Sequence, residues 1–214
     1  MSHEEWVNPH APEAKIGPKK DGAIDMIHKP ELVVDLDTGA VVDADVLPGD
    51  QVDHQGVCTR LLTAQQTINA AREQPPQVLT IKSATTDKGY YSVPELQALQ
   101  HEQIRTVIPD PVHNRRLDKL EETELQAVKA ARRSTRSVSG KRLLRRRGMH
   151  VERPFSHILD WGGMRRTTLR GIVNNAKRFK LSAGFYNLSQ LMRRLFGVGT
   201  PKQWAAVTPA FSLN

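Results

Sequence analysis

Two carboxylates in the sequence stand where acid chemistry could take place, and the first is Asp87. It lies in the segment TTDKGYYS, just after an apolar run with strand character, and Lys88 and Gly89 follow it. Open α/β sheets bind ligands at the carboxyl ends of their strands, so this position suits a working acid. The lysine adds a cation near a phosphate. An Asp at such a position can also start a loop or cap the next turn. The short motif by itself favours this structural interpretation over a catalytic one.

Glu152 is the second candidate, because it is the only acid between Glu124 and Asp160 and stands among arginines. One carboxylate surrounded by guanidinium groups is suited to binding a divalent metal ion while the arginines hold phosphates. Two carboxylates from separate elements, Mg²⁺ and a basic surround suit phosphodiester cleavage. The metal generates the attacking hydroxide and neutralises charge on the scissile phosphate. The alternative is a glutamate that balances charge in a basic surface cluster.

The charge distribution points to a polyanionic partner. Residues 1–110 carry nine Lys/Arg and 17 Asp/Glu, a balance of −8, whereas residues 111–214 carry 22 and six, a balance of +16. The densest window, residues 129–147, holds nine basic residues and no acid. Helix faces built for solubility usually mix charge signs. The window therefore favours nucleic-acid binding over a solvated face.

Composition excludes several other classes of protein. The single cysteine, Cys58, excludes an internal disulfide and a Cys-rich zinc site. No stretch approaches the roughly 18 uninterrupted apolar residues of a membrane span. The first ten residues lack the basic-then-apolar pattern of a secretory signal. The sequence therefore predicts a cytoplasmic protein with no membrane partner.

The elements that must position these residues begin with an arm and a hairpin. Residues 1–22 are polar and proline-rich, which predicts an extended arm. Apolar and acidic residues alternate in 31–36 and 40–47, and a turn with glycine joins the two runs. This pattern predicts a β-hairpin.

A βαβ unit is expected next. A helical stripe covers residues 56–73, and 78–81 is a β-branched run with strand character. Pro94 suits the first turn of a further helix, and 104–108 predicts another strand. Strand, loop, helix and strand imply parallel pairing of the two strands, with Asp87 in the loop that follows the first.

The second half of the chain is predicted to be helical. Helical spacing covers 117–133, a small polar connector covers 134–140, and helices broken at Trp161 cover 145–196. Residues 197–214 form a tail without clear periodicity. One apolar stripe near the end is predicted to be helix core; its members are Phe185, Leu188, Leu191, Met192 and Leu195.

Several blocks of the sequence occur in an order that resembles a known family. They are EEWVNPHAPEAKIGPKKDG, HKPELVVDLDTGAVVDADVLPGD, DKGYYSVPEL…IRTVIPDP, LLRRRGMHVERPFSHILDWGGMRRTTLRG and NLSQLMRRLFGVGTP. Together they resemble the C-terminal half of bacterial insertion-sequence transposases of the DDE type, and the resemblance covers nearly the whole chain. The first two blocks look like the segment that follows the first catalytic strand in those enzymes.

The resemblance implies an RNase H-like fold in which Asp, Asp and Glu bind two divalent ions, Mg²⁺ or Mn²⁺. Such enzymes nick DNA at element ends and join the freed 3′ hydroxyl to a target. By motif, Asp87 looks like the second acid and Glu152 like the glutamate. Basic residues are expected to hold DNA phosphates, namely Lys88, Arg145, Arg146, Arg147, Arg153, Arg165, Arg166 and Arg170. The implied partners are double-stranded DNA, as element ends and target, and a homo-oligomer or a full-length transposase, at the bacterial nucleoid.

The sequence also departs from the family. No residue matches the first Asp, which in the family lies on a strand before the segment where this chain begins. Asp21, Asp25, Asp35 and Asp37 belong to other blocks. The resemblance therefore predicts an N-terminally truncated fragment that is inactive alone, because one bridging carboxylate is lacking. Pro154 lacks a backbone N–H donor and stands two residues after Glu152. It is tolerable only if the helix that carries Glu152 starts nearby.

The predicted architecture is α/β. The arm at 1–22 precedes a partial RNase H-like mixed sheet with flanking helices at 23–196, basic and helical from about residue 115, and a tail follows. The predicted function is metal-dependent DNA strand cleavage and joining in transposition of an insertion sequence, incomplete in this chain. Two alternatives stay open: a non-catalytic DNA-binding remnant or regulator of transposition, and a decayed reading frame without a role.

Overall fold

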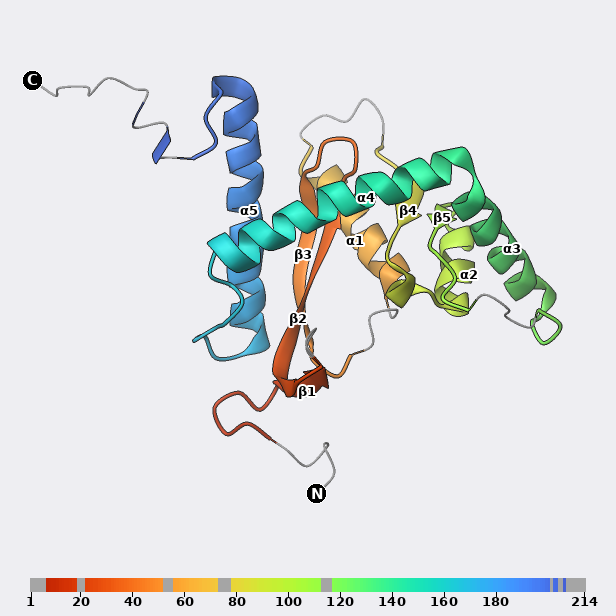
Figure 1. Cartoon of the computed structure of the whole chain (residues 1–214), viewed down its shortest axis with the longest axis horizontal. Coiled ribbons are helices and arrows are strands. Elements are labelled where there is room, and N and C mark those ends of the chain that lie inside the picture. The colour runs from red at the N-terminus through yellow and green to blue at the C-terminus, as the bar shows by residue number, and fades with distance from the viewer. Residues whose placement is uncertain are drawn as a thin grey trace, which may run out of the picture. The chain divides into compact units, whose positions relative to one another are not determined.

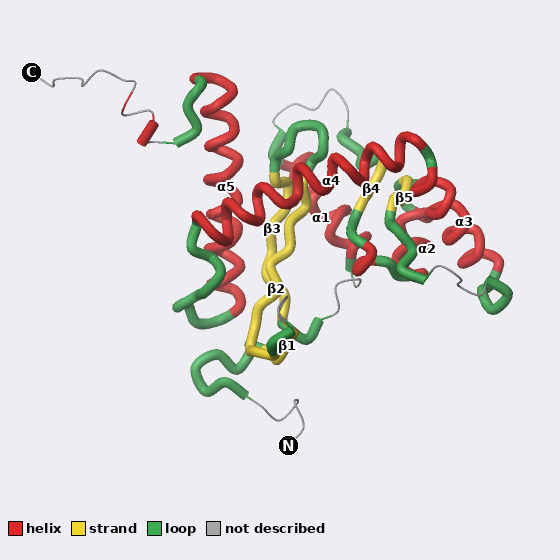
Figure 2. The backbone as a smooth tube through the Cα atoms, in the orientation of Figure 1, coloured by secondary structure: helices red, strands yellow, loops and turns green. Residues whose placement is uncertain are grey.

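The fold is known from a computed structural model, which describes residues 7–18, 22–51, 56–72, 78–112, 117–200, 202, 203 and 206. Helices and two small sheets make the protein mixed α/β, which confirms the predicted class (Figures 1 and 2). Its elements in chain order are β1 (Lys15–Pro18), β2 (Ile24–Val34), β3 (Val41–Pro48), α1 (Val57–Ala70), β4 (Ser83–Thr85), η2 (Lys88–Tyr90), α2 (Val93–His101), β5 (Arg105–Val107), α3 (Glu122–Arg136), α4 (Val138–Ser156), η3 (His157–Trp161) and α5 (Ile172–Phe196).

The chain divides into two compact units. Met1–Gly49 and Val151–Asn214 form one, which we call the hairpin unit, and Asp50–His150 forms the other, the βαβ unit. The hairpin unit contains β1 to β3 and α5, and the βαβ unit contains the two parallel strands β4 and β5. Helix α4 begins in the βαβ unit and ends in the hairpin unit. The predicted domain boundaries at residues 22 and 196 stay predictions.

The hairpin unit contains the predicted β-hairpin. Strands β2 and β3 pair antiparallel, with Glu31 opposite Asp45. The turn between them is closed by Asp35, whose backbone N–H donates to the Ala40 carbonyl at 2.9 Å. Strand β2 extends well before the apolar run that predicted it, and its first residues pair with β1. Residues 15–18, inside the predicted arm, therefore form a strand, because the longer β2 offers them backbone partners.

Helix α5 packs on β3 in the same unit (Figure 1). Phe179 and Ala183 of α5 are buried there with residues from β3 and η3, namely Val41, Ala44, Val46 and Ile158. The Asn187 amide bonds the backbone at the start of β3. It accepts a hydrogen bond from the Val41 N–H at 2.8 Å and donates to the Val41 carbonyl at 2.7 Å. A side-chain amide thus fixes helix and strand together.

The sequence predicted the wrong face of α5 as the buried one. Phe185, Leu188, Leu191 and Leu195 are all exposed, and Met192 is partly buried. The face turned to β3 carries Phe179, the small Ala183 and the bonding amide of Asn187, which allow the strand to approach closely. Hydrophobic spacing alone does not distinguish two apolar faces of one helix.

Replacing Asn187 by alanine is expected to lower the free energy of unfolding by about 2 kcal/mol, because two hydrogen bonds to Val41 are lost and each contributes about 0.5–1.5 kcal/mol. Urea denaturation followed by circular dichroism measures the change. Gln66→Ala, at an exposed position of α1, is the control and should stay within about 0.5 kcal/mol of wild type. An Asn187→Ala variant as stable as this control would contradict the bonding role.

The βαβ unit confirms the parallel pairing that the sequence predicted. Ser83 lies opposite Arg105, and Thr85 lies opposite Val107. Helices α2 and α3 pack against β5. The buried core includes Leu96, Leu99, Val107, Ile108 and Val128. Helix α1 is also confirmed, and α2 begins at Val93 with a proline in its first turn.

The predicted strand at 78–81 is wrong, because these residues bond to side chains of α1. Asn69 of α1 accepts from the Leu79 N–H and donates to the Leu79 carbonyl, both at 2.9 Å. Gln65 accepts from the Ile81 N–H at 2.7 Å. With these backbone groups engaged, the strand begins later, at Ser83.

The predicted polar connector at 134–140 is also wrong. Helix α3 continues to Arg136, and α4 begins at Val138. Ser137 joins them, since its hydroxyl donates to the Ser134 carbonyl at 2.6 Å and accepts from the Gly140 N–H at 3.0 Å. The polar residues there cap and join two helices instead of forming a loop. In the part of the chain that the structure describes, no helix is both long and apolar enough to cross a bilayer.

Candidate functional site

Asp87 presents its carboxylate to solvent at the end of β4. Its Oδ1 accepts a hydrogen bond from the Lys88 N–H at 2.7 Å, which caps the short helix η2. Its Oδ2 lies 3.7 Å from a guanidinium nitrogen of Arg147 on α4. The Asp87 side chain is 60% exposed, so it can reach a ligand as well as cap a turn. Both interpretations of the motif thus hold for its geometry.

The backbone around Asp87 is fixed from both sides. Before it, Thr85 pairs with Val107 in the parallel sheet. After it, the Tyr91 N–H donates to the Lys88 carbonyl at 3.1 Å, and the Tyr91 side chain is buried. In the described residues β4 pairs with β5 alone. The nearby Thr85 hydroxyl is buried there without a hydrogen-bond partner. The backbone at the end of β4 is therefore held on both sides, and the Thr85 hydroxyl has no hydrogen-bond partner among the described residues.

Glu152 lies on α4 and is exposed. It belongs to the hairpin unit, whereas Asp87 belongs to the βαβ unit. Pro154 is fully buried inside the same helix. This helix begins at Val138, so it does not start close to the proline as the sequence analysis required. The wider π-helical turn η3 follows at His157. A π-turn is a usual way to absorb a disturbed hydrogen-bond ladder.

Carboxylate oxygens are the donors that Mg²⁺ and Mn²⁺ prefer, so the chemistry of Asp87 and Glu152 fits these ions. The number of ligands does not. Across the described ranges, no three or more His, Cys, Asp or Glu side chains gather closely enough to hold a metal ion. The described residues therefore do not form a complete metal site.

The basic residues of α4 differ in their surroundings. Arg145 is exposed, while Arg146 and Arg147 are partly buried. Arg147 lies beside Asp87, so this exposed carboxylate and a guanidinium stand next to each other. Lys88 is exposed next to the same carboxylate. The structure thus brings together three of the residues that the sequence singled out: Asp87, Lys88 and Arg147.

The remaining predicted phosphate ligands lie in the hairpin unit. Arg153, Arg166 and Arg170 are exposed. Arg165 forms an ion pair with Asp160. Hydrogen bonds from Arg165 and then Ser156 lower the pKa of the Asp160 carboxyl. Arg165 is therefore partly committed to a nearby carboxylate of η3.

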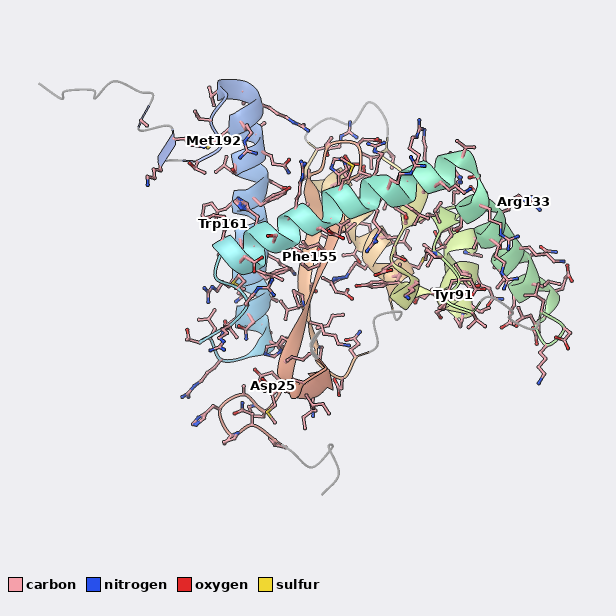
Figure 3. All side chains as sticks on the ribbon, viewed as in Figure 1. Asp25, Tyr91, Arg133, Phe155, Trp161 and Met192 are labelled. Atoms are coloured by element: carbon pink, nitrogen blue, oxygen red, sulfur yellow. The ribbon has the colours of Figure 1, made fainter. Side chains whose placement is uncertain are left out.

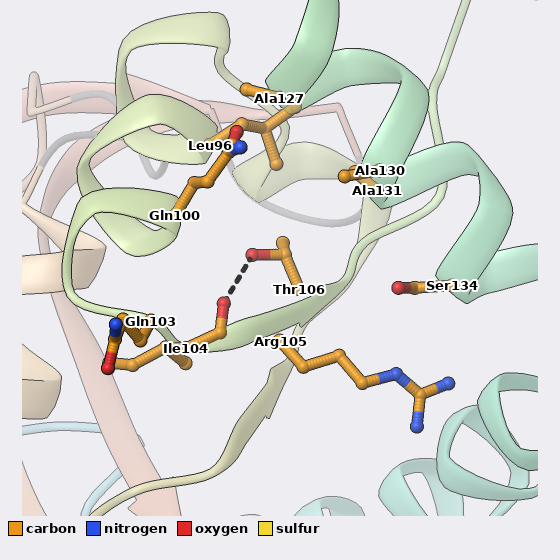
Figure 4. Close-up of a pocket in the computed structure, with 10 residues that line it drawn as sticks. All are labelled: Leu96, Gln100, Gln103, Ile104, Arg105, Thr106, Ala127, Ala130, Ala131 and Ser134. Atoms are coloured by element: carbon orange, nitrogen blue, oxygen red, sulfur yellow. Dashed lines mark hydrogen bonds between the residues drawn. The ribbon is translucent and has the colours of Figure 1, made fainter.

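Arg105 was not identified from the sequence. Its guanidinium donates to the hydroxyls of Ser137 at 3.0 Å and Ser139 at 2.9 Å, which ties β5 to the α3–α4 junction. It also borders a small pocket of about 260 Å³ between α2, β5 and α3 (Figure 4). Three alanines, Ala127, Ala130 and Ala131, line one side. Because Arg105 is engaged by the serines, this pocket offers little to a charged ligand.

Comparison with known proteins identifies a family for most of the chain. The family described as "Transposase DDE domain" matches residues 6–188, which is most of the chain. No curated protein and no solved structure matches. The matched range includes both candidate carboxylates and all the basic residues named above.

Proposed function

Because this chain belongs to the transposase DDE domain family, we propose that it binds double-stranded DNA and takes part in DNA strand cleavage and joining during transposition of an insertion sequence. The observation that carries the proposal is the exposed Asp87 carboxylate, held at the end of a parallel strand beside Arg147. An RNase H-like sheet followed by basic helices is the fold that accompanies this proposal. Its expected location is the DNA of the bacterial nucleoid.

The side chains near β4 have distinct roles in this proposal. Arg147 and Lys88 bind phosphate oxygens of the DNA strand that reaches Asp87. Guanidinium–phosphate hydrogen bonds are charge-assisted and geometrically specific, so they orient the phosphodiester. Asp87 and Glu152 supply carboxylate ligands for Mg²⁺ or Mn²⁺, which when bound provides Lewis-acid activation. Since two metal ions need several bridging ligands, a further acid has to join these two.

A second candidate function is DNA binding without catalysis. It is favoured by the absence, in the described part of the chain, of a cluster of three metal-binding side chains. In this alternative Arg147 and Asp87 form a surface ion pair, and the basic helices alone engage DNA. A homo-oligomer or a full-length transposase would then be the partner that completes the reaction.

Nicking of supercoiled plasmid DNA in the presence of Mg²⁺ or Mn²⁺ tests the catalytic proposal. If the chain or its homo-oligomer supplies the further acid, wild type should convert the plasmid to open circles, and Asp87→Ala and Glu152→Ala should reduce conversion to the level seen with EDTA, because each removes a metal ligand. Asp118→Ala, at an exposed acid outside the site, should cleave like wild type. Equal conversion by all four proteins would refute the catalytic roles, and DNA binding without any cleavage would favour the second function.

A further inference from the structure

The βαβ unit has a shallow basic groove, which is formed mainly by side chains from the second half of α3. It has a volume of about 650 Å³ and is lined by Leu117, Lys129, Arg132, Arg133, Arg136 and Ser137. Four of these six side chains are cationic. All four lie in the window 129–147 that the sequence favours for nucleic-acid binding, but none of them is among the individual residues expected to hold phosphates. Figure 3 shows Arg133 projecting outward from α3.

The four cations of the groove differ in whether a carboxylate pairs with them. Arg132 donates from Nε and Nη2 to Asp110 and forms an ion pair with it at 2.8 Å. The Asp110 side chain is only 9% exposed, so this pair holds the helix in place. Lys129, Arg133 and Arg136 are exposed, and within the described ranges no carboxylate pairs with them. Three positive charges therefore face the groove without a carboxylate partner among the described residues.

Their spacing forms a straight row. Positions 129, 133 and 136 are separated by four and three residues, which places them on one face of α3. At 1.5 Å per residue the row is about 10.5 Å long. The opposite face of α3 is buried through Ala127, Val128 and Ala131, so the row cannot rotate away. The Ser137 hydroxyl also fixes the end of the row through its bonds to Ser134 and Gly140.

Resting on the proposed action on DNA, we propose that this groove is a second DNA-contacting surface, which binds the backbone of duplex DNA through Lys129, Arg133 and Arg136 regardless of base sequence. A rigid row of cations fits a linear polyanion with regularly spaced charges. Phosphate contacts of this kind position a duplex without reading its sequence.

The groove and Arg147 contact different phosphates. Arg147 lies nine residues after Val138, where α4 begins, which is roughly 13.5 Å along the helix axis from the end of the groove at Ser137. This length corresponds to about four nucleotides along one strand at 3.4 Å each. The groove therefore holds the DNA that flanks the strand at Asp87 and sets the direction in which the duplex leaves the site.

The salt dependence of DNA binding by the full chain tests this surface. Fluorescence anisotropy of a labelled 30-base-pair duplex of arbitrary sequence, without divalent ions, gives the slope of log K against log [NaCl]. Each phosphate contact contributes about 0.9 to this slope, so Lys129→Gln, Arg133→Gln and Arg136→Gln combined should reduce it by about 2.7. Each single substitution should reduce it by about 0.9.

A matched control removes the same charge elsewhere. Lys82, Lys119 and Lys177 are exposed and lie outside the groove, and their combined change to glutamine should alter the slope by less than about 1. If wild type shows no salt-dependent DNA binding, the proposed function fails, and this surface with it. If wild type binds and the groove variant keeps its slope while remaining folded by circular dichroism, only the groove assignment is overturned. Binding of the groove to vesicles of anionic lipid, with an unchanged DNA slope, would also overturn it.

Discussion

Gly140→Ala is expected to destabilise the βαβ unit by about 3 kcal/mol or more, because it forces apart two helices that meet at Ser137. Gly140 is buried in the first turn of α4. A Cβ atom there would overlap the Ser134 carbonyl oxygen and lie 2.9 Å from the carbonyl carbon. These are backbone atoms of α3, which cannot rotate aside as a flexible side chain does. The helices must separate, and the hydrogen bonds of Ser137 are lost with the contact.

Gly148→Ala provides the matched control, since it places the same methyl group on the same helix. Nothing lies within 4 Å of a Cβ at this position. Alanine in a helix interior is favoured over glycine by about 0.5–1 kcal/mol, so this variant should be slightly more stable than wild type. Urea denaturation of both variants gives the two changes in unfolding free energy. Changes of the same sign would show that α3 and α4 do not approach as closely as the structure has them.

The α3–α4 junction illustrates where sequence patterns mislead. Ser134, Ser137, Ser139 and Gly140 have the composition of a flexible connector, and the sequence predicted one. Two of these serines engage the Arg105 guanidinium, and Ser137 also caps α4. The same residue types serve loops and tight helix junctions because both need short polar side chains and small volumes. A partner on β5, more than 30 residues earlier, decides between the two.

Elements with local signals were predicted well. The β2–β3 hairpin depends on alternation and a glycine turn, and α1 and α2 depend on helical spacing bounded by prolines. The run at 78–81 failed because Asn69 and Gln65, on a different element, take up its backbone groups. No window of the sequence around Leu79 contains that information.

The candidate site also has one part that the sequence could predict and one part that only the structure shows. The position of Asp87 after a strand follows from local order along the chain, and the structure has it just beyond β4. Its neighbour Arg147 is 60 residues away, so only the fold could show that the two approach. The match over residues 6–188 confirms the family resemblance. The metal-binding roles of Asp87 and Glu152 and the phosphate contacts of the arginines stay predictions, because they depend on ligands as well as on the chain.

Phe179→Ala is expected to have the largest effect on the hairpin unit. Phe179 belongs to α5, is 0% exposed and packs against the residues of β3. Truncation removes the buried ring and leaves a cavity under the hairpin, which for a fully buried phenylalanine costs about 3–5 kcal/mol. The variant should therefore unfold at much lower urea concentration than wild type, with far-ultraviolet circular dichroism following the loss of α5.

Phe185→Ala makes the same chemical change six residues later on the same helix. Phe185 is 68% exposed, so its truncation removes little buried area and should change the unfolding free energy by no more than about 0.5 kcal/mol. The pair of variants therefore tests which face of α5 meets the hairpin, independently of helix propensity, because both positions lose the same ring. A larger loss at Phe185 than at Phe179 would mean that the apolar stripe predicted from the sequence packs on β3 after all.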